Sequence, residues 1–490
     1  MKQLAALLIL SLVFTATQAQ IFNPGFETAS DTLTSMPLSW KKRPTEGYTV
    51  KLTDIEKHSG SKSLQIQSAG SVPGSYQSVT QTVPLKVDDL RRIALTAYVK
   101  TSNVHGNVQL LAQVLDSKGR MLSYQNSGMQ AAILSGINDW QKMTLKLTID
   151  SNAKTLLLGA SLTCSGTVWL DDFAIEDLPK PNMAPSKDLL KFTREVTTII
   201  KRSAIYADSV NWQGTEKGLQ ELAAMGLTME DSPVILDYIV SRLRLAGDKH
   251  TSYKSKTMAQ DYATRNSVAQ QPEGKLLSGG VGYISVPAFA SISDTAGVNY
   301  ATRIQNLIRN LDARQEIKGW VVDMRRNGGG NMSPMMAGLG PLTGEGILGY
   351  FVYTNTPMSK DYAWIYQKGS LTISKHKDVT VNNAYTLRKP DSKVAVLIGP
   401  NTGSSGEMTT LCFVGKPFTK LFGQPTAGYV SVNSSIKLST GAYLYLASGY
   451  AADRNQKKYT ADIQPDVMVA PGKDKSSDPA LDAALIWLKD

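Results

Sequence analysis

The proline-rich stretch at residues 178–185 divides this chain into two parts with different hydrophobic patterns. Before it, short runs of alternating polar and apolar residues recur between turn signals, as at Ile93–Val99 and Val108–Val114. After it, apolar residues first follow a helical spacing, and from Gly279 onward strand-like and helix-like segments alternate. Period-two alternation predicts a β-sandwich, whereas strands alternating with helices predict a largely parallel sheet covered by helices.

These patterns predict a multidomain protein, and 490 residues with 42% hydrophobic and 19% charged residues are enough for two or three globular domains. We expect an all-β sandwich at residues 20–178 and a linker at residues 179–185. Residues 186–260 are expected to be helical, and residues 261–490 to form an α/β core with a mostly parallel sheet.

The N-terminus has the pattern of a secretory signal. A charged start, Met1–Gln3, is followed by the mostly apolar run Leu4–Phe14 and the small-residue end Thr17–Ala19. This pattern predicts a signal peptide at residues 1–19, cleaved after Ala19, and the apolar run is short for a membrane span. We therefore expect an exported protein, periplasmic or extracellular, with no membrane span once the signal is removed.

Charge and cysteine content exclude some partners and bonds. The net charge of +11 is spread over short basic runs such as Lys41–Arg43, which argues against nucleic acid as a partner. The two cysteines, Cys164 and Cys412, lie in different predicted domains, so two buried free thiols are expected rather than a disulfide.

One turn carries a candidate nucleophile. The apolar run Val394–Ile398 predicts a buried strand, Gly399–Glu407 a turn of small residues, and Met408–Phe413 a helix. This order places a serine hydroxyl at a helix N-terminus, where free N–H groups and the helix dipole favour developing negative charge. Nucleophilic serines of α/β enzymes often lie in such turns, although serine also caps helices routinely.

Three further segments accompany this turn. They are Leu245–Tyr253, which contains Asp-Lys-His-Thr, the strand and triple-glycine turn Val322–Gly330, and Gly423–Tyr429. The glycine turn lacks the lysine and hydroxyl of a phosphate-binding loop. Bare backbone N–H groups at the end of a strand suit an oxyanion hole instead.

Together with Gly282–Ile284 and Ile463–Val467, these segments resemble the C-terminal-processing and tricorn-core family of serine peptidases over residues 186–490. In that family the nucleophile lies three residues before the acid, so the resemblance assigns Ser404 through Glu407. It also implies that the oxyanion donors are the N–H of Ser405 and a glycine N–H, from Gly329 or Gly330. Catalysis in this family needs no cofactor.

The expected base differs from that of the best-known branch of the family. That branch has a lysine where this chain has Tyr429. Tricorn-like members use a histidine from the Asp-x-His segment, which here is His250. The other histidines, His58, His105 and His376, lie in the β domain or in a polar stretch. An imidazole with a pKa near neutrality suits proton transfer, so His250 is the predicted base.

Supporting residues are predicted with the same reasoning. An acid is expected to orient the histidine, and Asp453 and Asp462 are the candidates in the right region of the chain. Asn433 matches a polar orienting position of the lysine-dependent branch. Asp323 and Arg325 are expected to brace the glycine turn as an ion pair.

The N-terminal part resembles jelly-roll carbohydrate-binding modules and galactose-binding-like domains. The resemblance rests on Asn23–Glu27, His58–Leu64, Asp139–Trp140 and Val168–Phe173. It implies a glycan partner and a structural calcium ion, for which Glu27 and Asp172 are the candidate ligands. Sugar binding needs exposed aromatic side chains, and Trp40, Tyr48 and Tyr76 are candidates unless they are buried.

The sequence thus predicts an exported serine endopeptidase acting on a peptide or protein through an acyl-enzyme. The interval from Thr251 to Gly280 is too short for the PDZ domain that many relatives carry, so the β-sandwich is expected to take over targeting. The alternative, motivated by Tyr429, is a degenerate peptidase that binds peptide or glycan without hydrolysis. An α/β-hydrolase esterase is excluded because the base precedes the serine.

Overall fold

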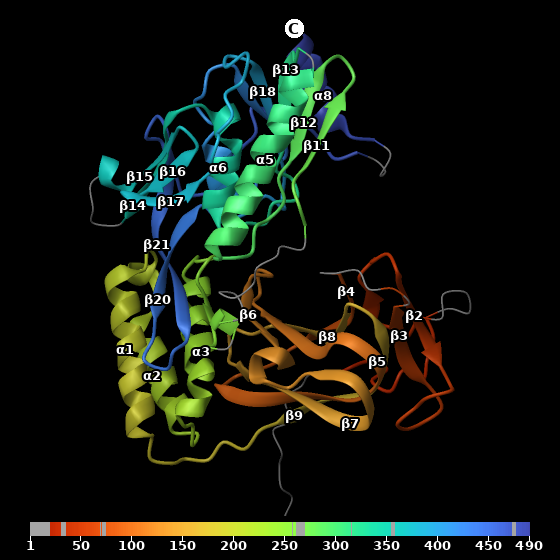
Figure 1. Cartoon of the computed structure of the whole chain (residues 1–490). Helices are drawn as coiled ribbons and strands as arrows, with labels where there is room; N and C mark the ends of the chain where they lie inside the picture. The colour runs from red at the N-terminus through yellow and green to blue at the C-terminus, as the bar shows by residue number, and fades with distance from the viewer. Residues whose placement is uncertain are drawn as a thin grey trace, which may run out of the picture. The chain divides into compact units, whose positions relative to one another are not determined.

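A computed structural model describes residues 20–30, 36–68, 70, 75–256, 258–260, 270–314, 316–353, 358–472 and 477–490. The predicted signal peptide at residues 1–19 lies outside this part of the chain. The chain divides into two compact units (Figure 1). The first runs to Thr193 and takes in Asn211–Leu245, and the second combines Arg194–Val210 with Ala246–Asp490. Each unit is described separately below.

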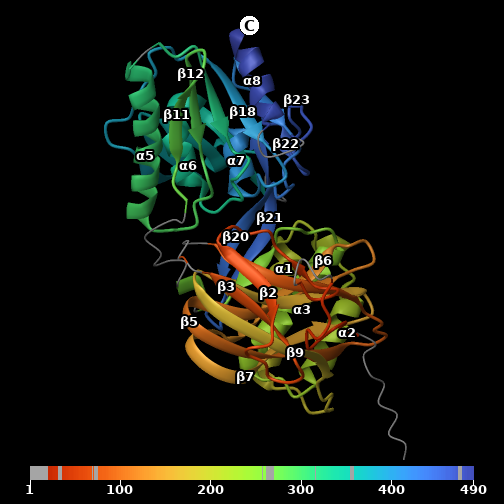
Figure 2. The same cartoon turned by 90° about the vertical axis from the view of Figure 1, so that its right-hand side faces the viewer.

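The first unit contains a sheet system of nine strands in which every pair is antiparallel. The strands are β1 (Lys41–Lys42), β2 (Tyr48–Thr53), β3 (Ser63–Ser68), β4 (Tyr76–Pro84), β5 (Arg91–Leu115), β6 (Met121–Asn126), β7 (Leu134–Ile149), β8 (Thr155–Thr163) and β9 (Gly166–Asp177), with the short 3-10 helix η1 (Ser127–Gln130). Strand β5 is 25 residues long; its first half pairs with β7 and β9, and its second half with β6 and β8 (Figure 2). The prediction of an all-β sandwich is confirmed.

Period-two alternation builds the core of this sandwich. In β5, Ile93, Leu95, Ala97 and Val99 are fully buried, because alternate side chains of a strand point to the same face. The ring of Trp40 also lies in the core, 5.0 Å from that of Phe26 and 4.9 Å from that of Phe173. Of the two explanations that the sequence leaves open for Trp40, sugar binding and burial, the structure shows burial, since Trp40 fills a core position.

Helices follow the linker, as the apolar spacing predicted. They are α1 (Lys187–Ser203), which begins in the first unit and ends in the second, α2 (Trp212–Ala223) and α3 (Ser232–Leu245), with the short 3-10 helices η2 (Ala207–Ser209) and η3 (Met229–Asp231). Asp237 of α3 is buried and accepts hydrogen bonds from Ser123 Oγ at 2.8 Å and Gln125 Nε2 at 2.8 Å. This carboxylate therefore ties α3 to strand β6.

The second unit contains a six-stranded sheet in the order β11-β12-β13-β18-β19-β23. Its strands are β11 (Glu273–Leu277), β12 (Val281–Ser285), β13 (Gly319–Asp323), β18 (Lys393–Ile398), β19 (Thr419–Gly423) and β23 (Val467–Met468). All neighbours from β12 to β23 are parallel, and β11 alone is antiparallel. Helix α8 (Pro479–Lys489) packs on one face, and α5 (Asp294–Arg314), α6 (Met332–Thr343) and α7 (Ser405–Leu411) pack on the other.

A second sheet in this unit has eight strands, and all its pairs are antiparallel. They are β10 (Ser252–Lys254), β14 (Gly346–Tyr353), β15 (Ala363–Gln367), β16 (Ser370–Ile373), β17 (His376–Thr380), β20 (Ser431–Lys437), β21 (Tyr443–Asp453) and β22 (Lys458–Tyr459), with the short 3-10 helix η4 (Lys360–Tyr362). The prediction of a mostly parallel sheet is therefore right for one of the two sheets only. The alternation of strands and helices does not predict the hairpins that join successive strands of the second sheet, and no local pattern indicates that β10 pairs with β21, almost two hundred residues away.

Two further features concern the whole described chain. Both cysteines are free, and Cys412 is buried whereas Cys164 is partly exposed. Among the residues that the structure describes, no helix is long and apolar enough to cross a membrane.

Candidate active site

Ser404 lies between strand β18 and helix α7, at the carboxyl end of the parallel sheet. Its φ of 53° and ψ of −120° are unusual for a residue with a side chain, and strained backbone of this kind concentrates at functional sites. Two hydrogen bonds to the segment after strand β13 hold the turn: Thr402 Oγ1 donates to Met324 O at 3.0 Å, and the Gly403 N–H donates to Asn327 O at 2.9 Å. The hydroxyl of Ser404 is thereby placed at the start of a helix, as the sequence predicted.

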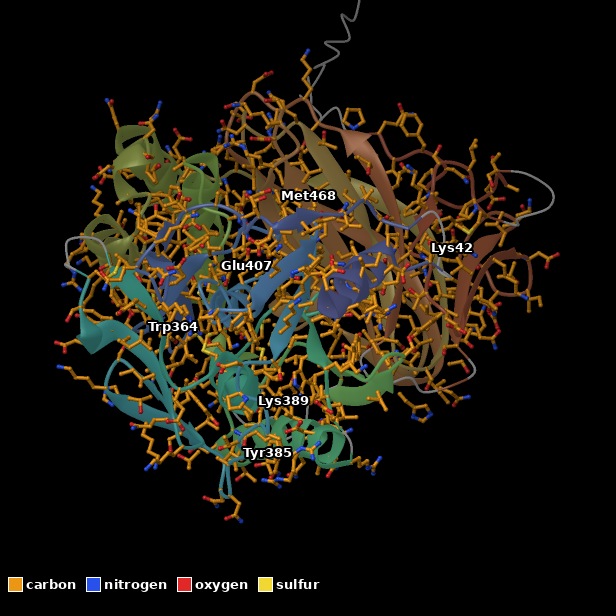
Figure 3. The ribbon with its side chains drawn as sticks, turned by 90° about the horizontal axis from the view of Figure 1, so that it is seen from above. Lys42, Trp364, Tyr385, Lys389, Glu407 and Met468 are labelled. Atoms are coloured by element: carbon orange, nitrogen blue, oxygen red, sulfur yellow. The ribbon has the colours of Figure 1, made fainter. Side chains whose placement is uncertain are left out.

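Glu407 anchors this turn from the interior, where it is fully buried (Figure 3). Its Oε2 accepts the N–H groups of Ser404 and Tyr429, both at 2.8 Å. Its Oε1 accepts the Gly428 N–H at 2.8 Å and Thr426 Oγ1 at 2.5 Å. Burial raises the pKa of Glu407, and these four donated hydrogen bonds oppose that rise. The carboxylate thus holds the candidate nucleophile by its backbone.

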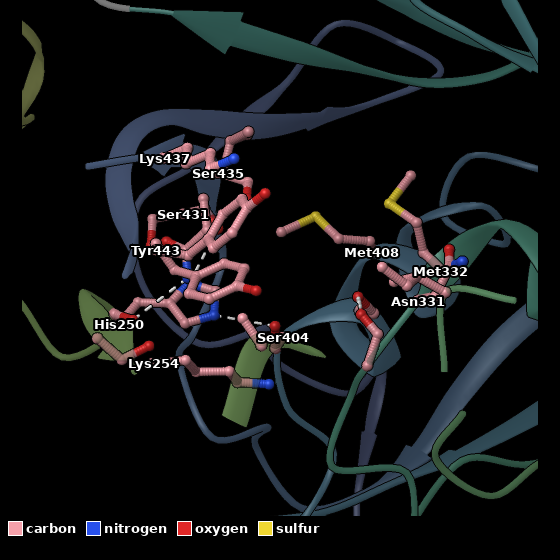
Figure 4. A pocket seen from close by; sticks show the side chains of 18 of the residues that line it. His250, Lys254, Asn331, Met332, Ser404, Met408, Ser431, Ser435, Lys437 and Tyr443 are labelled. Carbon is pink, nitrogen blue, oxygen red and sulfur yellow. Dashed lines mark hydrogen bonds between the residues drawn. The ribbon is translucent and has the colours of Figure 1, made fainter. Parts of the chain in front are cut away.

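His250 lies beside Ser404, with 2.9 Å between His250 Nε2 and Ser404 Oγ (Figure 4). On the other side of the ring, Nδ1 lies 3.0 Å from the carbonyl oxygen of Ser431 and 2.9 Å from its Oγ. A carbonyl oxygen only accepts hydrogen bonds, so Nδ1 carries the proton and Nε2 is left with its lone pair. This tautomer can accept the proton of the Ser404 hydroxyl.

The environment of His250 favours the neutral ring. Burial lowers the pKa of His250 below its ordinary value, and the negative charge of Asp248 partly offsets this effect. Asp248 is itself buried and accepts the N–H groups of His250 at 2.8 Å and Thr251 at 2.9 Å. It therefore fixes the backbone of the histidine, while its charge acts on the ring through space.

The structure does not bring the candidate acids to His250 Nδ1. The carboxylate of Asp453 accepts the N–H groups of Asn455 at 2.9 Å and Lys457 at 3.1 Å, and the hydroxyl of Tyr459 at 3.1 Å. It thus closes the β21–β22 turn. Asp462 lies with His250 around a neighbouring cavity of about 220 Å³ and accepts Gln464 Nε2 at 3.0 Å. Ser431, which occupies the position of an orienting acid, carries no sequence signal that could have identified it.

The predicted oxyanion donors surround Ser404. A side chain at Gly329 would lie 2.9 Å from Ser404 Cβ and 3.2 Å from the nitrogen of Ser405, so the glycine turn rests directly against the serine. Gly329 and Gly330 have φ angles of 113° and 111°, which glycine adopts readily. The Gly329 N–H donates to Asn327 Oδ1 at 3.0 Å. The N–H groups of Gly330 and Ser405 are therefore the better candidates for binding an oxyanion.

Comparison with known families agrees with this geometry. Residues 280–469 match the model of peptidase family S41, and residues 18–166 match that of a carbohydrate binding domain. Residues 280–469 form an S41 peptidase domain. The sequence resemblance to the C-terminal-processing peptidases is thereby confirmed.

Individual relatives match more than half of this chain. The nisin-resistance protein of Lactococcus lactis subsp. lactis is 27% identical over 340 residues, which cover 69% of this chain and 98% of that protein. A lipoprotein from Streptococcus agalactiae is similar in structure, with a TM-score of 0.49, 23% identity, and coverage of 63% of this chain and 98% of that one. A peptidase-like structure from Parabacteroides merdae has a TM-score of 0.43 and 18% identity, covering 62% and 97%.

Other predicted residues brace the S41 domain. Asp323 and Arg325 form an ion pair at 2.6 Å, and Arg325 also binds Asp478 at 2.7 Å. The hydroxyl of Tyr283 donates to Asp323 at 2.7 Å. Asn433 Nδ2 donates to the carbonyl oxygen of His250 at 3.2 Å, so Asn433 holds the histidine by its backbone rather than by its ring.

The residues predicted to bind calcium in the β-sandwich hold a loop. Glu27 accepts Ser61 N at 2.9 Å and Ser61 Oγ at 2.5 Å, while Asp172 accepts Ser59 Oγ at 2.9 Å and lies 2.7 Å from His58 Nδ1. Within the described ranges, no group of three or more His, Cys, Asp or Glu could hold a metal ion. The oxygens of both carboxylates are hydrogen-bonded to residues 58–61 rather than gathered around one point, as ligands of a calcium ion are. Calcium binding stays a prediction.

Proposed function

We propose that this protein is an exported serine endopeptidase that hydrolyses peptide bonds through an acyl-enzyme. The observation that carries the proposal is the pairing of Ser404 Oγ with His250 Nε2 at 2.9 Å, on a ring whose Nδ1 is held by Ser431. The match of residues 280–469 to peptidase family S41 supports the same chemistry. The signal-like N-terminus and the nisin-resistance relative support export and a role at the cell envelope.

The geometry allows a complete reaction without an acid at Nδ1. His250 Nε2 accepts the hydroxyl proton of Ser404 as Oγ attacks the substrate carbonyl carbon. The N–H groups of Ser405 and Gly330 stabilise the negative charge that forms on the carbonyl oxygen. The imidazolium then gives its proton to the leaving amine, and a water molecule hydrolyses the acyl-enzyme by the reverse sequence. The Ser431 carbonyl orients the ring throughout.

The β-sandwich supports a second part of the proposal, the binding of glycan for targeting. The ring of His58 stacks on that of Tyr98 with centroids 3.4 Å apart, and the Trp140 ring lies 5.9 Å from His58 at an angle of 62°. Tyr98 and Trp140 are partly exposed, and Lys100 and Glu56 form an ion pair at 2.9 Å. Aromatic faces beside polar groups suit sugar rings, so these residues replace Trp40 as the candidates for glycan contact.

A fluorophosphonate probe tests the serine chemistry directly, because it labels only an activated nucleophile. We expect labelling of the wild type, loss of labelling in Ser404→Ala, and at least a hundredfold slower labelling in His250→Ala, since general-base catalysis contributes about 10²–10⁴-fold. A folded wild type that does not react, or a Ser404→Ala variant that retains the label, contradicts the proposal.

A degenerate protein that binds peptide without cleaving it is the second candidate. It is favoured by Tyr429 in place of the family lysine and by a neutral carbonyl group, rather than a carboxylate, at His250 Nδ1. Mass spectrometry of a peptide library incubated with the protein separates the two candidates. Cleavage products that are absent from a Ser404→Ala control support the peptidase, and retained but intact peptides support the binding protein.

A further inference from the structure

The candidate active-site cavity of the S41 domain, about 890 Å³, continues from His250 over the face of three strands, β10, β21 and β20. The pairing of these strands sets their side chains in rows. Lys254 of β10 is opposite Tyr443 of β21, which is opposite Lys437 of β20. Residues opposite each other in neighbouring strands point to the same face, and all three line the cavity. We call Lys254, Tyr443 and Lys437 the lysine row.

The lysine row makes one end of the cavity positive. Among the residues that the structure describes, the Lys, Arg, Asp and Glu residues that line the cavity are Lys254, Lys256, Lys437 and Asp378. Asp378 is engaged by Ser333 Oγ, which donates to it at 2.8 Å. The amine of Lys254 lies 5.4 Å from the ring centroid of Tyr445, which turns this charge toward the candidate active site.

The chemistry of acyl transfer decides which part of a substrate meets this end. The imidazolium of His250 must give its proton to the leaving amine, so the segment after the cleaved bond lies on the histidine side of Ser404. Figure 4 shows Lys254, Ser431 and Lys437 on that side, and Met332 and Met408 on the other. The apolar methionines therefore face the acyl part of the substrate.

Strand β20 gives the leaving segment a path. Ser431 holds the ring of His250 and Asn433 holds its backbone, and Ser435 and Lys437 follow along the same strand and also line the cavity. At about 3.3 Å per residue, Lys437 lies roughly 20 Å along the strand from Ser431. The side chain of Lys254 reaches back over part of this distance. An extended peptide therefore meets the lysine row between roughly two and six residues after the cleaved bond.

We propose that the lysine row binds a carboxylate on the leaving segment of the substrate. The carboxylate is either the C-terminus of the peptide or an acidic side chain, and both present the same charge and acceptor oxygens to a lysine amine of the row. This proposal rests on the proposed function, because it takes its direction from His250 as the proton donor. It names the substrate class as peptides with a negative charge shortly after the cleaved bond.

Three fluorescence-quenched peptides test the proposal. They share an acyl part ending in leucine and a four-residue glycine–serine leaving segment, and they end in a free acid, in an amide, or in an amide with one internal glutamate. We expect kcat/KM to be about threefold to tenfold higher for the peptides that carry a carboxylate, as for partly exposed ion pairs, and the difference to shrink with salt. A gain with the free acid alone identifies the C-terminus as the ligand, and a gain with the glutamate identifies side chains.

The variants give the matched comparison. In the double variant Lys254→Gln and Lys437→Gln, we expect the ratio of kcat/KM for the carboxylate peptides to kcat/KM for the amide peptide to fall to about one. Lys318→Gln, an exposed lysine that does not line the cavity, keeps the preference. Equal cleavage of the three peptides by the wild type, or an unchanged preference in the folded double variant, overturns the proposal.

A binding measurement distinguishes failure of the lysine-row proposal from failure of the proposed peptidase function. Fluorescence anisotropy is measured with Ser404→Ala, which needs no catalysis, for three labelled leaving segments: the free acid, the amide, and the amide with one internal glutamate. Tighter binding of either carboxylate-bearing segment than of the plain amide, lost when both lysines are also replaced, supports the lysine row even if the wild type cleaves nothing. Equal binding of all three segments contradicts it even if the wild type is an active peptidase.

Discussion

Replacing Glu407 with glutamine tests whether the interior, rather than the turn sequence alone, holds the candidate nucleophile. The carboxylate of Glu407 accepts four hydrogen bonds, from the N–H groups of Ser404, Gly428 and Tyr429 and from the hydroxyl of Thr426. Glutamine has nearly the same shape, but only one of its two terminal atoms accepts hydrogen bonds. Even when the NH₂ group of Glu407→Gln points toward Thr426, whose hydroxyl can also accept, the Gly428 N–H and one N–H of the glutamine are left without an acceptor.

The cost follows from those two donors. Each buried donor left without a partner costs about 1–3 kcal/mol, so the pair costs about 2–6 kcal/mol. Removing a buried charge, whose pKa is raised by desolvation, returns part of this free energy. A net loss of about 3 kcal/mol lowers the melting temperature of a domain of this size by about 6–12 °C.

Thermal unfolding followed by circular dichroism measures this effect, and the fluorophosphonate label reports on the turn. We expect Glu407→Gln to melt 6–12 °C below the wild type at pH 7 and to react more slowly with the label. The control is Glu316→Gln, which removes an exposed ion pair with Lys389 and is expected to change the free energy of unfolding by less than about 0.5 kcal/mol. A melting temperature within about 2 °C of the wild type for Glu407→Gln would refute the reasoning.

Three further predictions concern titrating groups. Burial lowers the pKa of His250, and the ring must be neutral to act as the base. In a pH–rate profile, kcat/KM should therefore rise with pH through a midpoint below about 6.5, and a midpoint above about 7 contradicts this. Ser431→Asp places a carboxylate at Nδ1 and should raise that midpoint by about one unit or more in the same profile, whereas an unchanged midpoint means that the new side chain does not reach the ring. Burial raises the pKa of Asp237, so the stability that its protonated carboxyl contributes is present below its unfolded pKa and is lost as pH rises through its folded pKa. Asp237→Asn should therefore melt at a higher temperature than the wild type at pH 7, and at the same temperature near pH 3.5. Equal melting temperatures at pH 7 contradict this.

Much of the fold follows from local patterns in the sequence. Alternation in Ile93–Val99 predicts a strand of the sandwich, and the apolar run Val394–Ile398 predicts a buried strand, because both periodicities depend only on neighbouring side chains. The sequence leaves the place of Trp40 open, because an aromatic residue has the same local pattern in a core as on a sugar-binding face. In the antiparallel sheet, the pairing of Ser252 with Tyr445 joins residues far apart in the chain and has no local signal, whereas most of its other pairings join successive strands.

The residues of the candidate site also fall into two groups: those that the sequence predicts and those that depend on the tertiary structure. The sequence, with its family resemblance, predicts Ser404 through its turn and Glu407, and His250 through its segment and the scarcity of histidines in the chain. Only the tertiary structure decided what lies at His250 Nδ1, because the group is a backbone carbonyl, which every residue carries and no pattern marks. It also decided the lysine row, since the register of three strands places Lys254 and Lys437 on either side of Tyr443 along one cavity. Residue types and short-range periodicity are written in the sequence, whereas partners brought together by long-range pairing and burial exist only once the chain has folded.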